Sequence, residues 1–193
     1  MNRRPGFSLV ELLMVMAIIV ALGAAVLPAI TNVSDGMRLT NATQMLMDEI
    51  LVARATALSR NLPVEVWFVQ DGETSEYRLL RTAVIDNSER TTWVTGYKRL
   101  PAGVAMTAAG GRSNLIAVQN ARTLPDLALK GVALRINPSG QCEVADESAT
   151  IGPNEVLFVT VVLARHASSA ELPANFSTVQ INPINTRLTM FRP

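Results

Sequence analysis

The sequence predicts an α+β fold in which one long N-terminal helix precedes a mainly antiparallel, β-rich head. Two changes of pattern along the 193 residues carry this prediction. Residues 7–30 are almost continuously apolar, and residues 31–60 repeat apolar side chains every three or four positions, as helices do. After Pro63 the period becomes two, and turn-forming residues separate short runs, which is typical of antiparallel strands.

The hydrophobic residues are unevenly distributed along the chain. Overall, 49% of the residues are hydrophobic and 17% are charged, whereas ordinary soluble domains carry about 25% charged residues. Between Phe7 and Ile30, 20 of 24 residues are hydrophobic and Glu11 is the single charge. The chain is therefore one apolar segment joined to an ordinary globular part, which excludes disordered, collagen-like and multi-span membrane classes.

Charge and cysteine content exclude further classes. The formal net charge is +1, so no global basic field attracts nucleic acid. The single Cys142 leaves no intrachain disulfide, and with His166 as the one histidine no ordinary zinc site is available. We expect no bound metal and no cofactor.

The apolar segment has the length and flanks of a membrane helix. Arg3 and Arg4 precede it, so the positive-inside rule keeps the N-terminus cytoplasmic and exports the rest. As a helix, residues 7–30 span about 36 Å, enough to cross a bilayer. A plain anchor and a conventional signal peptide, cleaved after Ala21-Leu-Gly23, remain alternatives. No cysteine lies near the segment, which excludes a lipoprotein.

Glu11 does not fit a plain anchor or a signal peptide. A carboxylate at the centre of a membrane helix costs about 2.5–3.5 kcal/mol on insertion scales. Such a residue indicates a function and requires a partner.

The N-terminal residues resemble the type IV pilin and pseudopilin family. A short basic leader ends in Gly6, and Phe7, Ser8-Leu9-Val10-Glu11 and an apolar helix follow. The helix contains Pro28 where these helices commonly carry a kink-forming proline. The resemblance implies that a prepilin peptidase cuts between Gly6 and Phe7, and that the new Phe7 amine is N-methylated.

The resemblance also supplies a partner for Glu11. In a fibre, the Glu11 carboxylate of one subunit would face the Phe7 ammonium of a neighbour. Opposite charges attract strongly in a low dielectric and each is costly alone, so pairing occurs only in the right register. Phe7, Glu11 and Pro28 are therefore the candidate assembly residues, with apolar packing of the helices supplying most contact energy.

Residues 31–60 predict the amphipathic half of the same helix. Its apolar stripe comprises Leu39, Leu46, Ile50, Ala53 and Ala57, with Ala42, Met45 and Leu58 beside it. Gly36 is expected to loosen the junction between the two helical halves. Asn61-Leu62-Pro63 ends the helix, because proline disfavours helix before it.

The head, residues 61–193, is expected to be built of hairpins. Turn residues follow the predicted strands, most clearly at Asn137-Pro-Ser-Gly140 and Pro183-Ile-Asn-Thr186. The expected strands are residues 64–69, 76–84, 91–100, 104–107, 131–136, 141–144, 155–164, 178–182 and 187–191, with a loop over 108–125.

The head also resembles a subgroup of this family. Ala53-Arg54 through Pro63-Val64 and the turn at Ile136 to Gly140 are similar to GspH/FimT-type minor pseudopilins. The closing string from Asn175 to Pro193 resembles the pilin-like cassette protein D of Verrucomicrobia-type bacteria. These resemblances imply a pilin-like fold with the long helix packed on the sheet.

No catalytic residues are apparent in the head. His166 lies in a loop-like stretch with Ser168 and Ser169, outside any nucleophile elbow. The clusters near Asp71 and Asp146 lack EF-hand spacing, and Gly110-Gly111 is no phosphate loop. We expect a chain that is not an enzyme and has no small-molecule substrate.

DNA binding is a lesser alternative. Some pilin-like proteins bind DNA through a basic C-terminal segment, and this chain has Arg187 and Arg192 there, with Arg165 upstream. The family's Gly-Arg-x-Arg cluster is absent, and scattered arginines give a weak phosphate field.

The sequence therefore predicts a membrane-anchored minor pilin or pseudopilin. Its expected parts are the leader 1–6, the transmembrane and assembly helix 7–30, the amphipathic half 31–60 and the head 61–193. The expected partners are other pilin-like subunits, the prepilin peptidase, an inner-membrane assembly platform and the bilayer. The chain would cross the inner membrane once with a periplasmic head, then join a type IV pilus-like or type II secretion fibre. The rival is an exported β-rich binding or enzyme domain with an ordinary signal.

Overall fold

A computed structural model describes residues 8–193 apart from 87, 89, 110, 125, 127, 150, 153, 154 and 170, and the side chains of 24–32 also lie outside the described part. Gly6 and Phe7 lie outside the described residues, as does the side chain of Pro28. The chain falls into two compact units, Met1–Met37 and Arg38–Pro193. The division between the two units falls within one helix. The boundary expected at residue 61, between the helix and the head, stays a prediction.

Helix α1 (Leu9–Arg60) contains 52 residues and includes both halves predicted from the sequence. It is helical through Pro28 and Gly36, and the loosening expected at Gly36 stays a prediction. The kink expected at Pro28 stays a prediction. At the C-terminal end Asn61 adopts φ 51°, the left-handed conformation that commonly caps helices, and Pro63 follows.

Within the second unit, α1 buries one face in the core. Eight side chains spaced three or four residues apart are buried there, as expected for one stripe of a helix. They are Leu39, Ala42, Thr43, Leu46, Glu49, Ile50, Ala53 and Ala57. The predicted stripe is therefore confirmed, whereas the neighbouring Leu58 is 53% exposed.

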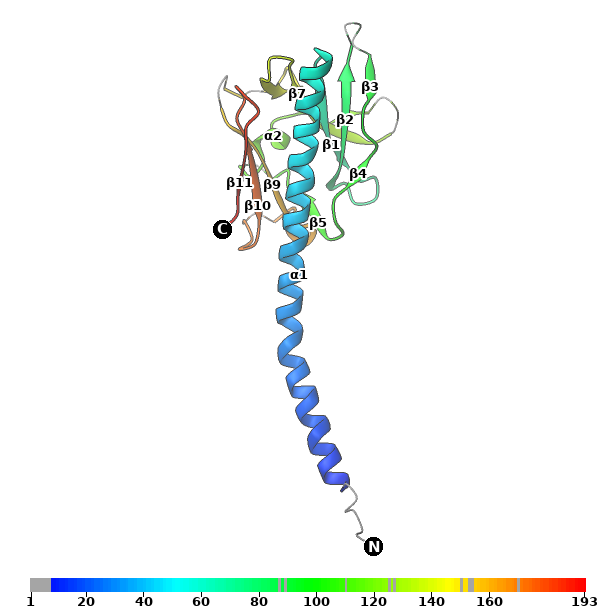
Figure 1. Ribbon diagram of the computed structural model, residues 1–193, viewed down its shortest axis with the longest axis vertical. Coiled ribbons are helices and arrows are strands. Elements are labelled where there is room, and N and C mark those ends of the chain that lie inside the picture. Colours follow the sequence, from blue (N-terminus) through cyan, green and yellow to red (C-terminus); the bar gives the residue numbers. More distant parts are fainter. Residues whose placement is uncertain are drawn as a thin grey trace. The chain divides into compact units, whose positions relative to one another are not determined.

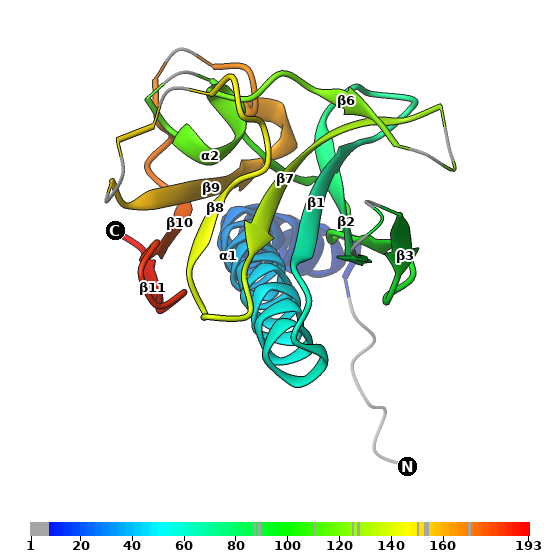
Figure 2. The same cartoon turned by 90° about the horizontal axis from the view of Figure 1, so that it is seen from above.

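The strands of the second unit form one antiparallel sheet among the described residues, in the order β11-β10-β9-β5-β2-β1-β7-β6 (Figures 1 and 2). Strands β3 and β4 pair with β2, and β8 pairs with β7. The bounds are β1 (Val64–Gln70), β2 (Tyr77–Ile85), β3 (Thr91–Trp93), β4 (Lys98–Arg99), β5 (Val104–Met106), β6 (Arg122–Thr123), β7 (Lys130–Ile136), β8 (Cys142–Val144), β9 (Leu157–Leu163), β10 (Ser177–Ile181) and β11 (Leu188–Phe191). Two short helical segments, α2 (Asn114–Ala117) and η1 (Ala164–His166), interrupt this series.

Strand β1 lies between β2 and β7 and is buried on both faces. Val66 and Phe68 join the core that contains the buried face of α1, while Trp67 and Val69 join a second cluster. This alternation follows the two-residue period of a strand. Opposite β1, a Cβ added to Gly131 would lie 2.7 Å from the Phe68 carbonyl oxygen, so this close approach requires glycine.

Two predicted elements differ from the structure. The single strand expected over residues 91–100 is divided into β3 and β4, because four residues from Val94 to Tyr97 stand opposite two residues of β2. The loop expected over 108–125 contains α2 and β6. The other predicted strands are present with ends shifted by one or two residues, and the α+β fold class is confirmed.

The packing of α1 on the core gives a first prediction. Leu46→Ala should lower the free energy of unfolding of the detergent-solubilised protein by about 2–5 kcal/mol, because Leu46 is fully buried. The matched control Leu58→Ala, at an exposed position of the same helix, should change it by less than about 0.5 kcal/mol. Equal effects in denaturant titrations would contradict this account of the packing.

Candidate functional site

The N-terminal end of α1 is closed by reciprocal hydrogen bonds between Ser8 and Glu11. The Ser8 backbone N–H and the Ser8 hydroxyl both donate to Glu11 Oε2, each at 2.9 Å. The Glu11 N–H donates back to Ser8 Oγ at 3.2 Å. Ser8 is the N-cap and Glu11 is the third helical residue, so the pair forms a capping box.

This cap shows how the single charge of the apolar segment is held. Both Ser8 donors reach the same carboxylate oxygen, Oε2. The negative carboxylate also lies at the positive end of the helix dipole. We did not predict this arrangement, although Ser8-Leu9-Val10-Glu11 has the local spacing that signals a capping box.

The first turns of α1 expose their apolar side chains. From Leu9 to Leu22 the large hydrophobic side chains are between 47% and 75% exposed. Apolar surface of this extent is stabilised when lipid or protein removes it from water. Within the part of the chain that the structure describes, no helical stretch combines the length and apolarity needed to cross a membrane.

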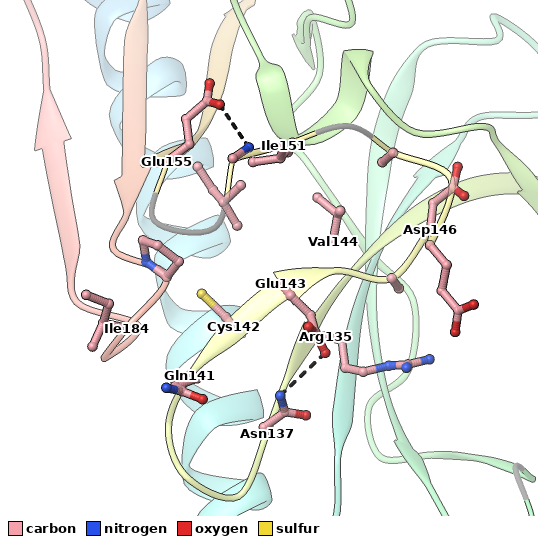
Figure 3. A pocket seen from close by; sticks show the side chains of 16 residues that line it. Arg135, Asn137, Gln141, Cys142, Glu143, Val144, Asp146, Ile151, Glu155 and Ile184 are labelled. Carbon is pink, nitrogen blue, oxygen red and sulfur yellow. Dashed lines mark hydrogen bonds between the residues drawn. The ribbon is translucent and has the colours of Figure 1, made fainter.

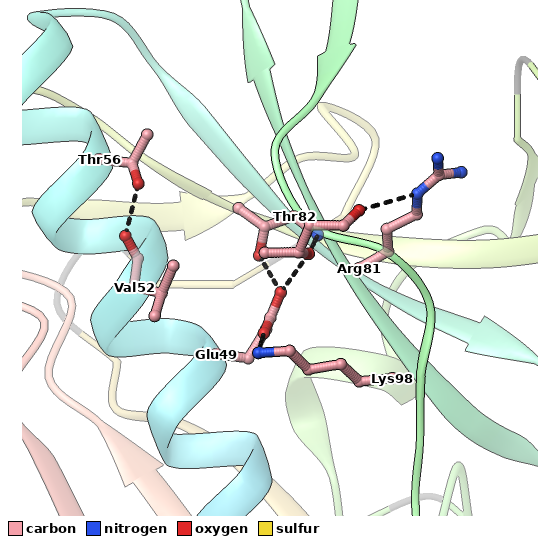
Figure 4. A network of polar contacts seen from close by, with 7 residues as sticks. Glu49, Val52, Thr56, Arg81, Thr82 and Lys98 are labelled. Carbon is pink, nitrogen blue, oxygen red and sulfur yellow. Dashed lines mark hydrogen bonds and ion pairs between the residues drawn. The ribbon is translucent and has the colours of Figure 1, made fainter.

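A buried carboxylate, Glu49, links α1 to the sheet (Figure 4). Its Oε1 accepts hydrogen bonds from the hydroxyls of Thr82, at 2.5 Å, and Thr95, at 2.7 Å. Its Oε2 forms an ion pair with Lys98 Nζ at 2.6 Å. Thr95 also accepts a hydrogen bond from the Thr82 N–H, which explains why the strand is interrupted between β3 and β4.

The environment of Glu49 favours its charged form. Burial by itself would raise the pKa of this carboxyl, but Lys98 and the two threonine hydroxyls outweigh burial and hold the pKa below its ordinary value of 4.5. Both carboxylate oxygens have partners within the chain, the two threonine hydroxyls on Oε1 and the Lys98 ion pair on Oε2. We therefore interpret Glu49 as a structural residue that fixes α1 on the sheet.

A second polar group lies on the other side of the sheet. The Arg81 guanidinium stacks between the rings of Trp93, at 3.8 Å, and Tyr97, at 4.3 Å, and it forms an ion pair with Asp126. The Asp126 carboxylate offsets the charge of this arginine, and the two rings hold its guanidinium by cation–π contact. The cluster stabilises the head and offers little free positive charge to a nucleic acid.

A cavity of about 500 Å³ opens beside β8 and the β10–β11 turn (Figure 3). Its acidic lining residues are Glu143, Asp146, Glu147 and Glu155. Asp146 accepts hydrogen bonds from Ser148 and from the Asn120 N–H, which lower its pKa to about 2. Glu155 accepts one from the Gly152 N–H at 3.3 Å. Asp146 and Glu155 are therefore engaged by described residues of this chain, Asn120, Ser148 and Gly152.

Cys142 and His166 lie on different elements, β8 and η1. Cys142 is buried in β8, and burial raises the pKa of its thiol to about 11, so the reactive thiolate is scarce near neutral pH. His166 ends η1, where its Nε2 accepts a hydrogen bond from Arg165 Nε at 3.2 Å. Among the described residues, no group of three His, Cys, Asp or Glu side chains could hold a metal ion.

The structure places Arg187 and Arg192 at opposite ends of β11. Four residues of extended chain lie between them, which separates the two Cα atoms by roughly 16 Å. Arg192 donates hydrogen bonds to Thr40 on α1, at 2.6 Å, and to Asn175, at 3.2 Å. The two arginines considered for DNA contact are therefore not brought together, and Arg192 is engaged in holding the C-terminus to α1.

The Glu49 network gives a prediction about pH. Lys98→Met should lower the free energy of unfolding at pH 7 by about 1–3 kcal/mol, below the loss for fully buried pairs, because Lys98 is 41% exposed. A lowered pKa stabilises the fold above the unfolded value of about 4.5, and this contribution is lost as the pH falls through the folded pKa. The difference between wild type and variant should therefore shrink below pH 4.5.

The exposed Lys130 supplies the control for this measurement. Lys130→Met removes the same charge and should change stability by less than about 0.5 kcal/mol at either pH. Denaturant titrations at pH 7 and pH 3.5 would compare the three proteins. A Lys98→Met effect that persists unchanged at pH 3.5 would contradict the ionic contribution.

Comparisons with known proteins bear on the N-terminal segment and the fold. Residues 1–27 match the family described as "Prokaryotic N-terminal methylation motif". A comparison with curated protein sequences returns no match. Among solved structures, the chain is similar to the minor pseudopilin EpsH from the type 2 secretion system of Vibrio cholerae, with 12% identity and a TM-score of 0.47, over 81% of this chain and 98% of that chain. The type IV pilin-like signal recognised in the sequence is therefore confirmed, and the chain joins this N-terminal methylation motif to an α+β head.

Proposed function

We propose that this chain is a minor pilin or pseudopilin subunit of a type IV pilus-like or type II secretion fibre. The observation that carries the proposal is the N-terminal methylation motif over residues 1–27, joined to a helix whose single early charge is held by Ser8. The role is structural and needs no catalysis by the chain. Its partners are other pilin-like subunits, the prepilin peptidase, an inner-membrane assembly platform and the bilayer.

Before assembly, residues 7–30 anchor the subunit in the inner membrane, with the N-terminus cytoplasmic and the head periplasmic. The exposed apolar side chains of α1 support this step, because lipid removes them from water. Arg3 and Arg4 support the orientation. Capping by Ser8 lowers the cost of placing Glu11 near apolar surroundings, because its carboxylate already accepts two hydrogen bonds.

During maturation the peptidase cuts between Gly6 and Phe7. The cap survives this step, because Ser8 keeps its amide N–H through its bond to Phe7. The new Phe7 amine adds a positive charge beside the helix N-terminus. That charge is offset by the Glu11 carboxylate of a neighbouring subunit, so the two charges bring subunits into one register.

Processing gives the prediction that separates this proposal from an ordinary exported domain. N-terminal sequencing of the mature, membrane-extracted protein should begin at Phe7, with an N-methyl group. Gly6→Leu should leave the leader attached without changing the stability of the head. A mature N-terminus near residue 24 would indicate signal peptidase and would overturn the proposal.

Assembly gives a second prediction. Glu11→Leu should insert into the membrane and be processed as wild type, yet its incorporation into sheared fibres should fall by at least about tenfold, because the Phe7 ammonium loses its partner. Val10→Leu is the matched control at an adjacent exposed position and should assemble normally. Normal incorporation of Glu11→Leu would count against charge pairing.

Substitutions of Ser8 separate the contribution of the cap to fibre incorporation from that of the Glu11 charge. Ser8→Ala removes the hydroxyl donor but keeps the backbone N–H bond to Glu11, so we expect a smaller loss of fibre incorporation than in Glu11→Leu. Ser8→Thr keeps the hydroxyl and should restore incorporation. Quantitative immunoblots of sheared fibres and membranes would measure both.

A further inference from the structure

The outer face of α1 in the second unit carries an uncovered apolar stripe. Asp48, Leu51, Ala55 and Leu58 form this outer helix stripe, since spacings of three and four residues align them along one line. Leu51 is 46% exposed and Leu58 is 53% exposed. The stripe lies on the side of α1 opposite the buried residues Leu46, Ile50 and Ala53.

A second exposed surface lies on strands β10 and β11 and reaches β9 only at Phe158, because the other residues of β9 are buried. In their register Gln180 stands between Phe158 and Thr189, and Thr178 stands next to Phe191. The outer sheet face comprises Phe158, Gln180, Arg187, Thr189 and Phe191. Gln180, Arg187 and Thr189 are exposed and Phe158 is half-buried, while Phe191 is 54% exposed and its ring lies 6.2 Å from that of Phe176.

The two surfaces face away from the same core. Val159 and Val179, which alternate with Phe158 and Gln180 along their strands, are buried in the cluster that contains Leu46 and Ile50 of α1. Figures 1 and 2 show α1 beside β10 and β11 around that core. The outer helix stripe and the outer sheet face therefore point in opposite directions and can meet only between two molecules.

Their chemistry is complementary. Leu51, Ala55 and Leu58 offer an apolar ridge, and Phe158 and Phe191 offer apolar surface to receive it. Asp48 gives the stripe a negative charge, and Arg187 gives the sheet face a positive one. This pairing repeats the arrangement inside the head, where the other face of α1 packs on the other face of the same sheet.

Contact between like surfaces is less favourable. In parallel register, two outer helix stripes would bring Asp48 against Asp48, and two outer sheet faces would bring Arg187 against Arg187. Like charges placed across an interface oppose association. The charges therefore favour contact between unlike surfaces.

We propose that the outer helix stripe of one copy docks on the outer sheet face of a second copy of this chain. The contact is heterologous, so each copy keeps one free surface of each kind and can extend a row of heads. This inference goes beyond the proposed function, which concerns the N-terminal segment.

Cross-linking of the full-length chain in the membranes of producing cells tests the contact. One tagged copy carries Ala55→Cys and a second, differently tagged copy carries Thr189→Cys. Cys142 is buried and stays out of the reaction. We expect mild oxidation to form mixed dimers when both variants are present, at least about tenfold more than between two Ala55→Cys copies. Glu73→Cys, at the exposed β1–β2 turn, replaces Thr189→Cys as the control and should give background cross-linking.

Charge variants test whether the cross-link reports a specific contact. Asp48→Arg in the first copy, or Arg187→Asp in the second, should lower the yield by about tenfold. Both changes together should restore it. Yields equal to the Glu73→Cys control, or failure of the double exchange to restore cross-linking, would overturn the inference. The mature N-terminus, determined on the same sample, keeps a failure of this contact distinct from a failure of the proposed function.

Discussion

Glu11 is a carboxylate in a segment that otherwise offers apolar surface, and the rest of the assembly account depends on how its charge is satisfied. An isolated charge in a low dielectric is costly, and hydrogen bonds and an opposite charge reduce that cost. Ser8 supplies two hydrogen bonds from within the chain, but neither Ser8 donor is charged. Ser8 therefore supplies no opposite charge to the Glu11 carboxylate. In the proposed fibre, the amine of a neighbouring Phe7 supplies it. The Glu11–Phe7 pair can form at only one relative position of two neighbouring helices, and this sets the register between subunits.

A second acidic residue of α1 shows the contrasting case. Glu49 is fully buried and is satisfied inside the chain by Lys98, Thr82 and Thr95. Its network holds the helix to the sheet and divides one strand into β3 and β4. Helix α1 therefore contains one carboxylate, Glu49, that is paired within its own chain, and another, Glu11, whose charge we propose is paired by a neighbouring subunit. This difference separates a residue that stabilises the fold from one proposed to assemble the fibre.

Local periodicity predicted most of the fold. The stripe from Leu39 to Ala57 and the turns at Asn137-Pro-Ser-Gly140 and Pro183-Ile-Asn-Thr186 are local signals, and the structure confirms the elements they predict. The break between β3 and β4 was not predictable in this way, because it depends on a contact between Thr95 and Glu49, 46 residues apart. The contact between Arg192 and Thr40 was not predictable for the same reason, because the two residues are 152 positions apart in the sequence. The Ser8–Glu11 cap was predictable, because a serine three residues before a glutamate is a local signal.

The central claim is that Glu11 of one subunit meets the Phe7 amine of another. Zero-length carbodiimide cross-linking of isolated fibres, built from a mixture of isotopically light and heavy subunits, measures this pair directly by mass spectrometry. The account predicts a peptide in which the Phe7 amine is joined to the Glu11 carboxylate, with mixed isotopes showing that two chains contributed. Intact fibres in which Glu11 is never joined to the Phe7 amine of another chain would contradict it.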